Sequence, residues 1–176
     1  MGKSVPTSAP GWVPGSSKRL ELLGPRWPSQ AWSLLGRPQR LPGKEKLRPL
    51  VEAAKKARLR AYSPYSGVKI GAAVLTSSGK IFSGTNIENA SYGLACCAER
   101  TAIFKAVSEG NRDILAIAVV GKSEDFTKPC GACRQVMVEF NPRMKVLRRG
   151  LDGFAKDGTA ASLLPAHFNP RELSKR

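Results

Sequence analysis

Three cysteines and one glutamate carry the clearest chemistry in this sequence. Cys97 stands two residues before Glu99, and Cys130 and Cys133 form a Cys-x-x-Cys motif directly after Pro129. Three thiolates can bind a zinc ion and leave its fourth coordination position open for water. Bound zinc lowers the pKa of such a water toward neutrality, and a glutamate beside it can transfer protons. The pattern therefore predicts a catalytic zinc site with its own acid/base group.

Both cysteine groups are expected at the N-terminal ends of helices. Apolar residues recur at helical spacing after Cys97, at Ala98, Ala102, Ile103, Ala106 and Val107. A helix N-terminus favours thiolate over thiol, through its dipole and its free N–H groups. Three thiolates would give the site a net negative charge, and Arg100 is the expected counter-charge that keeps the metal a Lewis acid.

The four cysteines could instead form a closed structural zinc site or disulfides. Cys96 could join the other three in a closed structural zinc site, but adjacent side chains diverge on a helix and rarely reach one metal. Disulfides fit less well, because a Cys-x-x-Cys motif with a distant Cys-x-Glu favours a metal or redox use. We therefore expect Cys96 to be a small buried residue outside the site.

The chain is strongly basic, with 29 Lys and Arg against 13 Asp and Glu among 176 residues. Such a balance permits contact with nucleic acid or with an anionic surface. Polynucleotide-binding proteins, however, usually offer aromatic side chains for base stacking, and these are scarce after residue 43. The basic residues are therefore expected to form a solvated surface, without a nucleic-acid partner.

The composition changes at about residue 43. Residues 1–43 hold all three tryptophans and seven of the thirteen prolines, with six basic residues and one acidic residue. Proline at this density prevents a continuous helix, so we expect a largely disordered extension. It could be a targeting segment or translated sequence upstream of the true start. It contains no apolar run of membrane-spanning length and no secretory signal, which favours a cytoplasmic protein without membrane contact.

Residues 44–176 suffice for one compact domain. Hydrophobic periodicity predicts three helices, over about 44–61, 97–109 and 131–140. It also predicts four strands, over about 68–76, 80–85, 114–120 and 145–148. The segment 147–159 is basic and irregular in pattern. Helices that alternate with strands predict a three-layer α/β/α sandwich with a mixed central sheet.

Several segments together resemble one known family. They are 62–66 (YSPYS), 70–73 (IGAA), 84–92 (GTNIENASY), 97–102 (CAERTA), 129–135 (PCGACRQ) and 163–168 (LLPAHF). These segments are similar to those of the small, homotetrameric, zinc-dependent cytidine deaminases of pyrimidine salvage, over residues 44–176. The resemblance implies the same fold, a bound zinc ion and a homotetramer. It also implies hydrolytic deamination of cytidine and deoxycytidine to uridine and deoxyuridine.

The resemblance implies roles for the residues around the metal. The zinc ligands would be Cys97, Cys130 and Cys133. Glu99 would take a proton from water, deliver one to N3 of the cytosine ring and later protonate the departing amine. Val68 stands where the family usually has an aromatic residue that lines the base, so one wall of the base pocket is expected to be weaker.

The resemblance also implies a sugar site that two subunits share. Asn86 and Glu88 would hydrogen-bond the ribose hydroxyls. Ala90 and Tyr92 would approach the ribose from another chain, and Phe168 would stack near the base from another chain.

Two other functions compete with cytidine deamination. A sister deaminase that acts on an aminonucleoside antibiotic such as blasticidin S would share the zinc core, but the segment 86–89 (NIEN) argues against it. A non-enzymatic, zinc-stabilised nucleic-acid-binding module would use the basic surface, but such a module has no need of Glu99.

Overall fold

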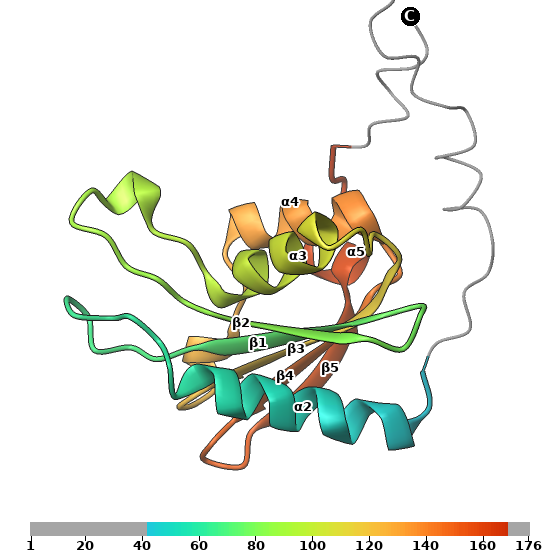
Figure 1. Cartoon of the computed structure of the whole chain (residues 1–176), viewed down its shortest axis with the longest axis horizontal. Coiled ribbons are helices and arrows are strands. Elements are labelled where there is room, and N and C mark those ends of the chain that lie inside the picture. The colour runs from blue at the N-terminus through green and yellow to red at the C-terminus, as the bar shows by residue number, and fades with distance from the viewer. Residues whose placement is uncertain (1–41, 169–176) are drawn as a thin grey trace, which may run out of the picture. The chain divides into compact units, whose positions relative to one another are not determined.

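The computed structural model describes residues 42–168 (Figure 1). Nearly all of the predicted extension 1–43 lies outside the described residues, so its disorder stays a prediction. Every helix within residues 42–168 is too short or too polar to cross a membrane.

A five-stranded mixed sheet forms the centre of the domain. In sheet order its strands are β2 (Ile81–Thr85), β1 (Gly71–Thr76), β3 (Ile114–Gly121), β4 (Lys145–Gly150) and β5 (Ala155–Thr159). β3 and β4 run parallel, whereas the other neighbouring strands are antiparallel. β1 and β3 are buried along almost their whole length, because helices cover both faces of the sheet at its centre.

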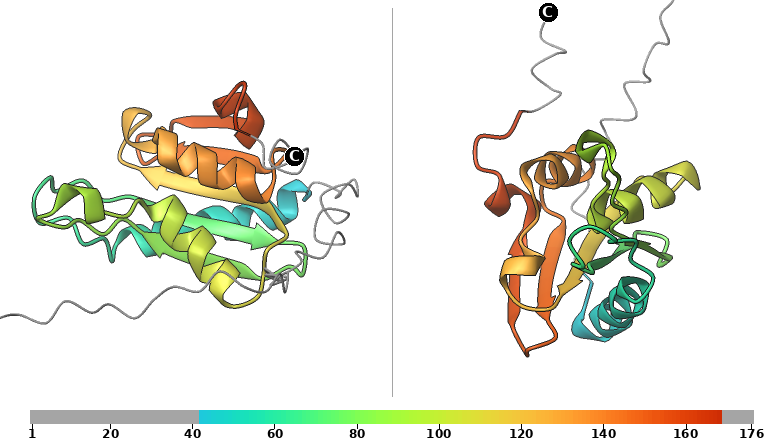
Figure 2. Two further views of the ribbon diagram at one scale, coloured as in Figure 1. Left: turned by 90° about the horizontal axis from the view of Figure 1, so that it is seen from above. Right: turned by 90° about the vertical axis from the view of Figure 1, so that its left-hand side faces the viewer.

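Helices form a layer on each side of this sheet (Figures 1 and 2). On one face, α2 (Lys44–Arg58) packs against β1, β2 and β3. On the other face lie α3 (Ala98–Ser108), α4 (Gly131–Phe140) and the short α5 (Ala160–Leu163). The predicted α/β/α sandwich with a mixed sheet is therefore confirmed, and its two apolar cores lie between the sheet and each helical layer.

The segment between α2 and β1 differs from the prediction. The helix expected to continue to residue 61 ends at Arg58, and the strand expected from Val68 begins at Gly71. The residues between them form a loop, because their main-chain groups pair with the segment that follows β2. Tyr62 pairs with Ile87 in a parallel β-bridge outside the main sheet.

The irregular sequence pattern of 147–159 predicts no strand beyond residue 148, but β4 continues to Gly150 and a further strand, β5, follows. β4 and β5 form a regular antiparallel hairpin, in which Lys145 pairs with Thr159 and Arg149 with Ala155. Its charged residues pair across the hairpin: Arg149 Nη1 lies 2.7 Å from Asp157 Oδ1, and Lys145 Nζ lies 3.7 Å from Asp157 Oδ2. Cross-strand ion pairs stabilise a sheet. The charged residues that hide the alternating strand pattern in the sequence therefore stabilise the pairing of the two strands.

β2 and α3 approach each other closely at Gly84. A Cβ atom at this position would lie 2.8 Å from the carbonyl oxygen of Ala98 and closer still to the amide nitrogen of Ala102. Both are main-chain atoms of α3, so they can move only if the helix moves. Glycine at position 84 therefore allows α3 to pack directly on the sheet.

We expect Gly84→Ala to destabilise the domain by about 1–3 kcal/mol, because the added methyl group must push α3 away from β2. The free energy of unfolding from denaturant titration measures this. Gly93→Ala is the matched control, since a Cβ atom there meets nothing within 4 Å. Equal stability of the two variants would show that the contact at Gly84 does not constrain α3.

Candidate metal centre and active site

The N-terminal ends of α3 and α4 bring three thiols together. Cys97 is the residue that caps α3, Cys130 caps α4, and Cys133 lies in the first turn of α4. The three Sγ atoms lie within 4.8 Å of one another. The predicted position of both cysteine groups at helix N-termini is therefore confirmed.

The geometry and chemistry of this cluster fit zinc. A Zn–S bond of about 2.3 Å and tetrahedral angles place two ligand sulfurs about 3.8 Å apart. The Sγ atoms of Cys97 and Cys130 are separated by 3.8 Å. All three cysteines are free thiols, and thiolate is a ligand that zinc takes readily. Three protein ligands leave one coordination position open, as in catalytic zinc sites.

The surroundings favour a thiolate at Cys97. Contact with the Cys133 thiol lowers the pKa of Cys97, and the Arg100 guanidinium lowers this pKa further, although burial opposes both effects. The same contact raises the pKa of Cys133, which is buried and keeps its proton while Cys97 is ionised. In the absence of a metal ion, the negative charge of the cluster thus resides first on Cys97.

Glu99 lies in the first turn of α3 and is only 4% exposed. Burial raises the pKa of its carboxyl group to about 7, and the negative charge of Cys97 acts in the same direction. A group with this pKa can both accept and release a proton near neutral pH. A buried carboxyl group beside a metal-binding cluster is therefore a strong candidate for an acid/base group.

Arg100 lies beside the thiols. Burial alone would lower the pKa of its guanidinium, but hydrogen bonding to Cys97 and the charges of Cys96 and Cys97 raise this pKa instead. Its Nη2 donates a hydrogen bond of 3.0 Å to the carbonyl of Ala95. Its Nε is buried and has no hydrogen-bond partner among residues 42–168. The cation thus lies close enough to Cys97 to interact with it, and its role as a counter-charge stays a prediction.

Cys96 lies outside the group of three thiols, as predicted. The prediction that it is buried is wrong, because its side chain is half-buried. Its Sγ accepts a hydrogen bond of 3.5 Å from the Thr101 hydroxyl. Its main chain pairs with Ile87 through two hydrogen bonds of 2.9 Å, in an antiparallel bridge. This bridge turns the side chains of Cys96 and Cys97 to opposite sides.

The same bridge connects the cluster to Asn86 and Glu88, which flank Ile87. The amide of Asn86 faces the loop before β1: Nδ2 donates to the carbonyl of Val68 at 2.8 Å, and Oδ1 accepts from the Ile70 amide at 2.8 Å. Asn86 therefore holds the main chain on both sides of Lys69.

Glu88 receives hydrogen bonds from the same loop. Its Oε2 accepts from the amides of Tyr65 at 2.9 Å and Ser66 at 3.2 Å, and its Oε1 accepts from the Ser66 hydroxyl. The Ser66 hydroxyl has the largest effect and lowers the pKa of Glu88; burial raises this pKa, and the two amides lower it further, so the net shift is downward. The carboxylate is therefore ionised at neutral pH. The sequence alone indicated no role for Ser66, although it lies in the segment 62–66 that contributes to the family resemblance.

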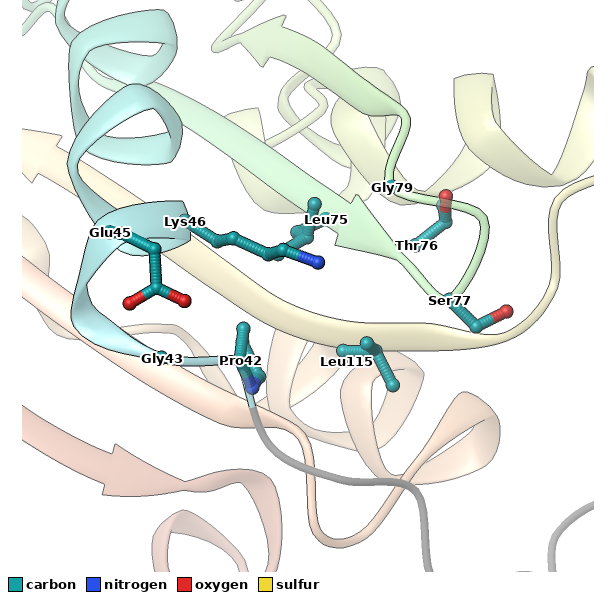
Figure 3. A pocket seen from close by; sticks show the side chains of 9 residues that line it. All are labelled: Pro42, Gly43, Glu45, Lys46, Leu75, Thr76, Ser77, Gly79 and Leu115. Carbon is teal, nitrogen blue, oxygen red and sulfur yellow. The ribbon is translucent and has the colours of Figure 1, made fainter.

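A pocket of about 340 Å³ opens beside Glu88. Its lining consists of Tyr65, Ser66, Glu88, Asn89, Tyr92 and Ala95. The volume is in the range of small-molecule sites. A second pocket, of about 570 Å³, lies between the start of α2 and the β1–β2 turn (Figure 3). None of the predicted site residues lines it, so we assign it no part in the chemistry.

The other predicted substrate contacts lie at the surface. Tyr92 is 82% exposed and Phe168 is 55% exposed, and Ala90 is also exposed. Val68 is half-buried. In a single chain the first three face solvent, so their predicted action on the substrate of another subunit stays a prediction.

Comparison with known proteins agrees with this geometry. Residues 44–148 match the family described as the cytidine and deoxycytidylate deaminase zinc-binding region. A cytidine deaminase from Halalkalibacterium halodurans is 50% identical over 126 residues, which are 71% of this chain and 96% of that protein. A probable cytidine deaminase from Dictyostelium discoideum is 46% identical over 130 residues, 73% of this chain and 88% of that protein.

The crystal structure of cytidine deaminase from Burkholderia pseudomallei superposes with a TM-score of 0.65 at 50% identity, covering 69% of this chain and 98% of that one. With its zinc-compatible thiols and this similarity, the chain belongs to the cytidine and deoxycytidylate deaminase family.

Proposed function

We propose that this chain is a zinc-dependent enzyme that deaminates cytidine and deoxycytidine hydrolytically, releasing ammonia. The observation that carries the proposal is the buried Glu99 beside three converging thiols. A structural zinc site needs only its ligands. Burying a carboxyl group beside them lowers the stability of the domain, so its presence there favours a functional role. The relatives named cytidine deaminases support the substrate class.

The proposed zinc ligands are Cys97, Cys130 and Cys133. When bound there, zinc supplies a Lewis acid that makes water a nucleophile near neutral pH. The chain contributes the electrostatic surroundings of these ligands. Both helix N-termini and the Arg100 guanidinium offset the negative charge of three thiolates. Without that compensation the thiolates would neutralise the ion and weaken its acidity.

Glu99 is the proposed proton shuttle. Its carboxylate accepts a proton from the attacking water, and the resulting acid protonates N3 of the cytosine ring. A second proton transfer then goes to the amine at C4, which leaves as ammonia, while the oxygen of water becomes the C4 carbonyl of the product. One group can serve all these transfers because its pKa of about 7 allows both protonation states.

Asn86 and Glu88 are the proposed anchors of the sugar. An ionised carboxylate offers about four acceptor positions, and three at Glu88 are already occupied. One position is left for a sugar hydroxyl. Asn86 Nδ2 likewise has a second N–H after its bond to Val68. The bridge between Ile87 and Cys96 sets these anchors beside the segment that carries Cys97.

A homotetramer is the proposed assembly. Large apolar side chains are exposed on the loops that carry the proposed sugar anchors: Tyr62 and Ile87 pair in one bridge, and Tyr65 and Tyr92 line the pocket beside Glu88. Exposed apolar side chains that gather in one region mark an interaction surface. Another copy of the chain is the proposed partner, and Ala90, Tyr92 and Phe168 would then complete the substrate site of a neighbour.

Zinc content tests the ligands. We expect Cys133→Ala to lose stoichiometric zinc, because two thiolates bind the ion much less tightly than three. Cys96→Ala should keep one zinc ion per chain, since its thiol lies outside the cluster. Metal analysis after dialysis measures both. Loss of zinc from Cys96→Ala as well would indicate a closed site of four thiols.

The loss of ultraviolet absorbance by cytidine and deoxycytidine tests the reaction. We expect Glu99→Gln to keep its zinc and to lose turnover by a factor of about 100–10,000, because it can no longer transfer protons. Glu109→Gln, at the exposed end of the same helix, is the control and should behave like the intact protein. Stoichiometric zinc without turnover of either nucleoside by the intact protein would refute the proposed function.

Subunit complementation tests the assembly. Sedimentation should give about four times the chain mass of 19.0 kDa. Glu99→Gln and Tyr92→Ala should each be impaired, but co-expressed chains should regain turnover, because a hybrid site can combine an intact Glu99 with an intact Tyr92 from its neighbour. Glu99→Gln with Cys97→Ala is the control pair and should not recover, since both residues belong to one chain's own centre. A monomeric protein, or no recovery by the first pair, would contradict shared sites.

A further inference from the structure

We propose that Ser66 is a positioning residue that fixes the Glu88 carboxylate for the sugar and ties it to the main chain of Val68. The inference rests on the function proposed above. Ser66 contacts Glu88 twice, through its hydroxyl to Oε1 and through its amide to Oε2 at 3.2 Å. The Ser66 hydroxyl oxygen also accepts a hydrogen bond of 3.0 Å from the Val68 amide. One side chain thus links the proposed sugar anchor to the residue at the base wall.

The direction of each hydrogen bond at Ser66 is determined. A serine hydroxyl has one proton to donate, and an ionised carboxylate can only accept. The Val68 amide can only donate, so it occupies a lone pair of the Ser66 oxygen. The hydroxyl proton must therefore point to Glu88. Neither bond can reverse, which makes Ser66 a fixed connection between the two residues.

The main chain around Glu88 is already held by other bonds. The Glu88 amide donates to the carbonyl of Tyr62 at 2.8 Å, and the Tyr62 amide donates to the carbonyl of Asn86 at 3.1 Å. The loop closes through Gly67, whose amide donates to the carbonyl of Ser63 at 3.0 Å and whose φ is +69°. The side chain of Glu88 is oriented separately, by the amides of Tyr65 and Ser66 at Oε2 and by the Ser66 hydroxyl at Oε1. The Ser66 hydroxyl is the one side-chain donor among these three.

The remaining acceptor position of Glu88 faces available space. Both Ser66 and Glu88 line the pocket of about 340 Å³. Three acceptor positions of the carboxylate are used by Tyr65 and Ser66, and a ligand hydroxyl in the pocket can take the fourth. Without the bond from the Ser66 hydroxyl, only Oε2 would stay bound, to the two amides, so the carboxylate could turn about Oε2 and its fourth acceptor position would change direction. Ser66 thus acts through Glu88 and need not touch the substrate.

Steady-state kinetics with two nucleosides test this role. We expect Ser66→Ala to raise KM for cytidine by about tenfold or more, as for loss of a hydrogen bond to a charged group, while kcat changes little. The inhibition constant of 2′,3′-dideoxycytidine, which lacks both sugar hydroxyls, should be the same in Ser66→Ala and the intact protein. Ser66→Thr keeps the hydroxyl and should restore KM.

Ser63→Ala is the matched control, an identical change in the same turn, and should leave both constants unchanged. Ser66→Cys keeps the size of the side chain but donates weakly, and it replaces the alanine variant if that variant does not fold. An unchanged KM for cytidine would overturn the inference. So would an equal weakening for dideoxycytidine, because that is what a general structural role predicts. Failure of the intact protein to turn over cytidine would instead refute the proposed function.

Discussion

Three thiolates at one point repel one another, and the fold of this domain is arranged so that they can still converge. The N-termini of α3 and α4 meet on one face of the sheet, and each is capped by a cysteine. A helix N-terminus stabilises a negative charge by about 0.3–1 kcal/mol, so two of them and a nearby guanidinium offset part of the repulsion and leave the rest to a bound cation. Gly84 is part of this arrangement, because it lets α3 pack directly on β2.

The acid/base group depends on the same negative charge. Glu99 follows Cys97 by two residues on α3 and is buried with it, so desolvation and the thiolate both disfavour its ionised form. Arg100 limits this effect, because its positive charge lies next to both groups. Burial, thiolate and guanidinium together set a pKa of about 7. The environment that binds the metal ion therefore also tunes the proton shuttle that we propose.

Local patterns in the sequence predicted the sandwich and the positions of the thiols. The spacing of Cys97, Cys130 and Cys133 and the helical periodicity after them depend on residues close together in the chain. The strand β5 was missed because the partners of its charges lie on the opposite strand, as Arg149 does for Asp157. The contacts of Glu88 were missed for a related reason. Two of its three donors are main-chain amides, which every residue except proline has, and which therefore leave no signal in the sequence.

The proposed sugar and metal sites are connected through the main chain. Ile87 pairs with Tyr62 on one side and with Cys96 on the other, so three segments far apart in the chain form a small ladder beside the main sheet. Asn86 and Glu88 flank its middle member, and Cys97 directly follows its outer member. Adjacent members of such a ladder lie about 5 Å apart, so the proposed sugar anchors are fixed one strand spacing from the segment that leads into the first thiol. The ladder also explains Cys96: its main chain makes the bridge, and its side chain turns away from the metal because Cys97 turns toward it. The proposed sugar anchors are thus fixed relative to the proposed metal ligands by main-chain pairing, and this connection does not involve the basic residues of the surface.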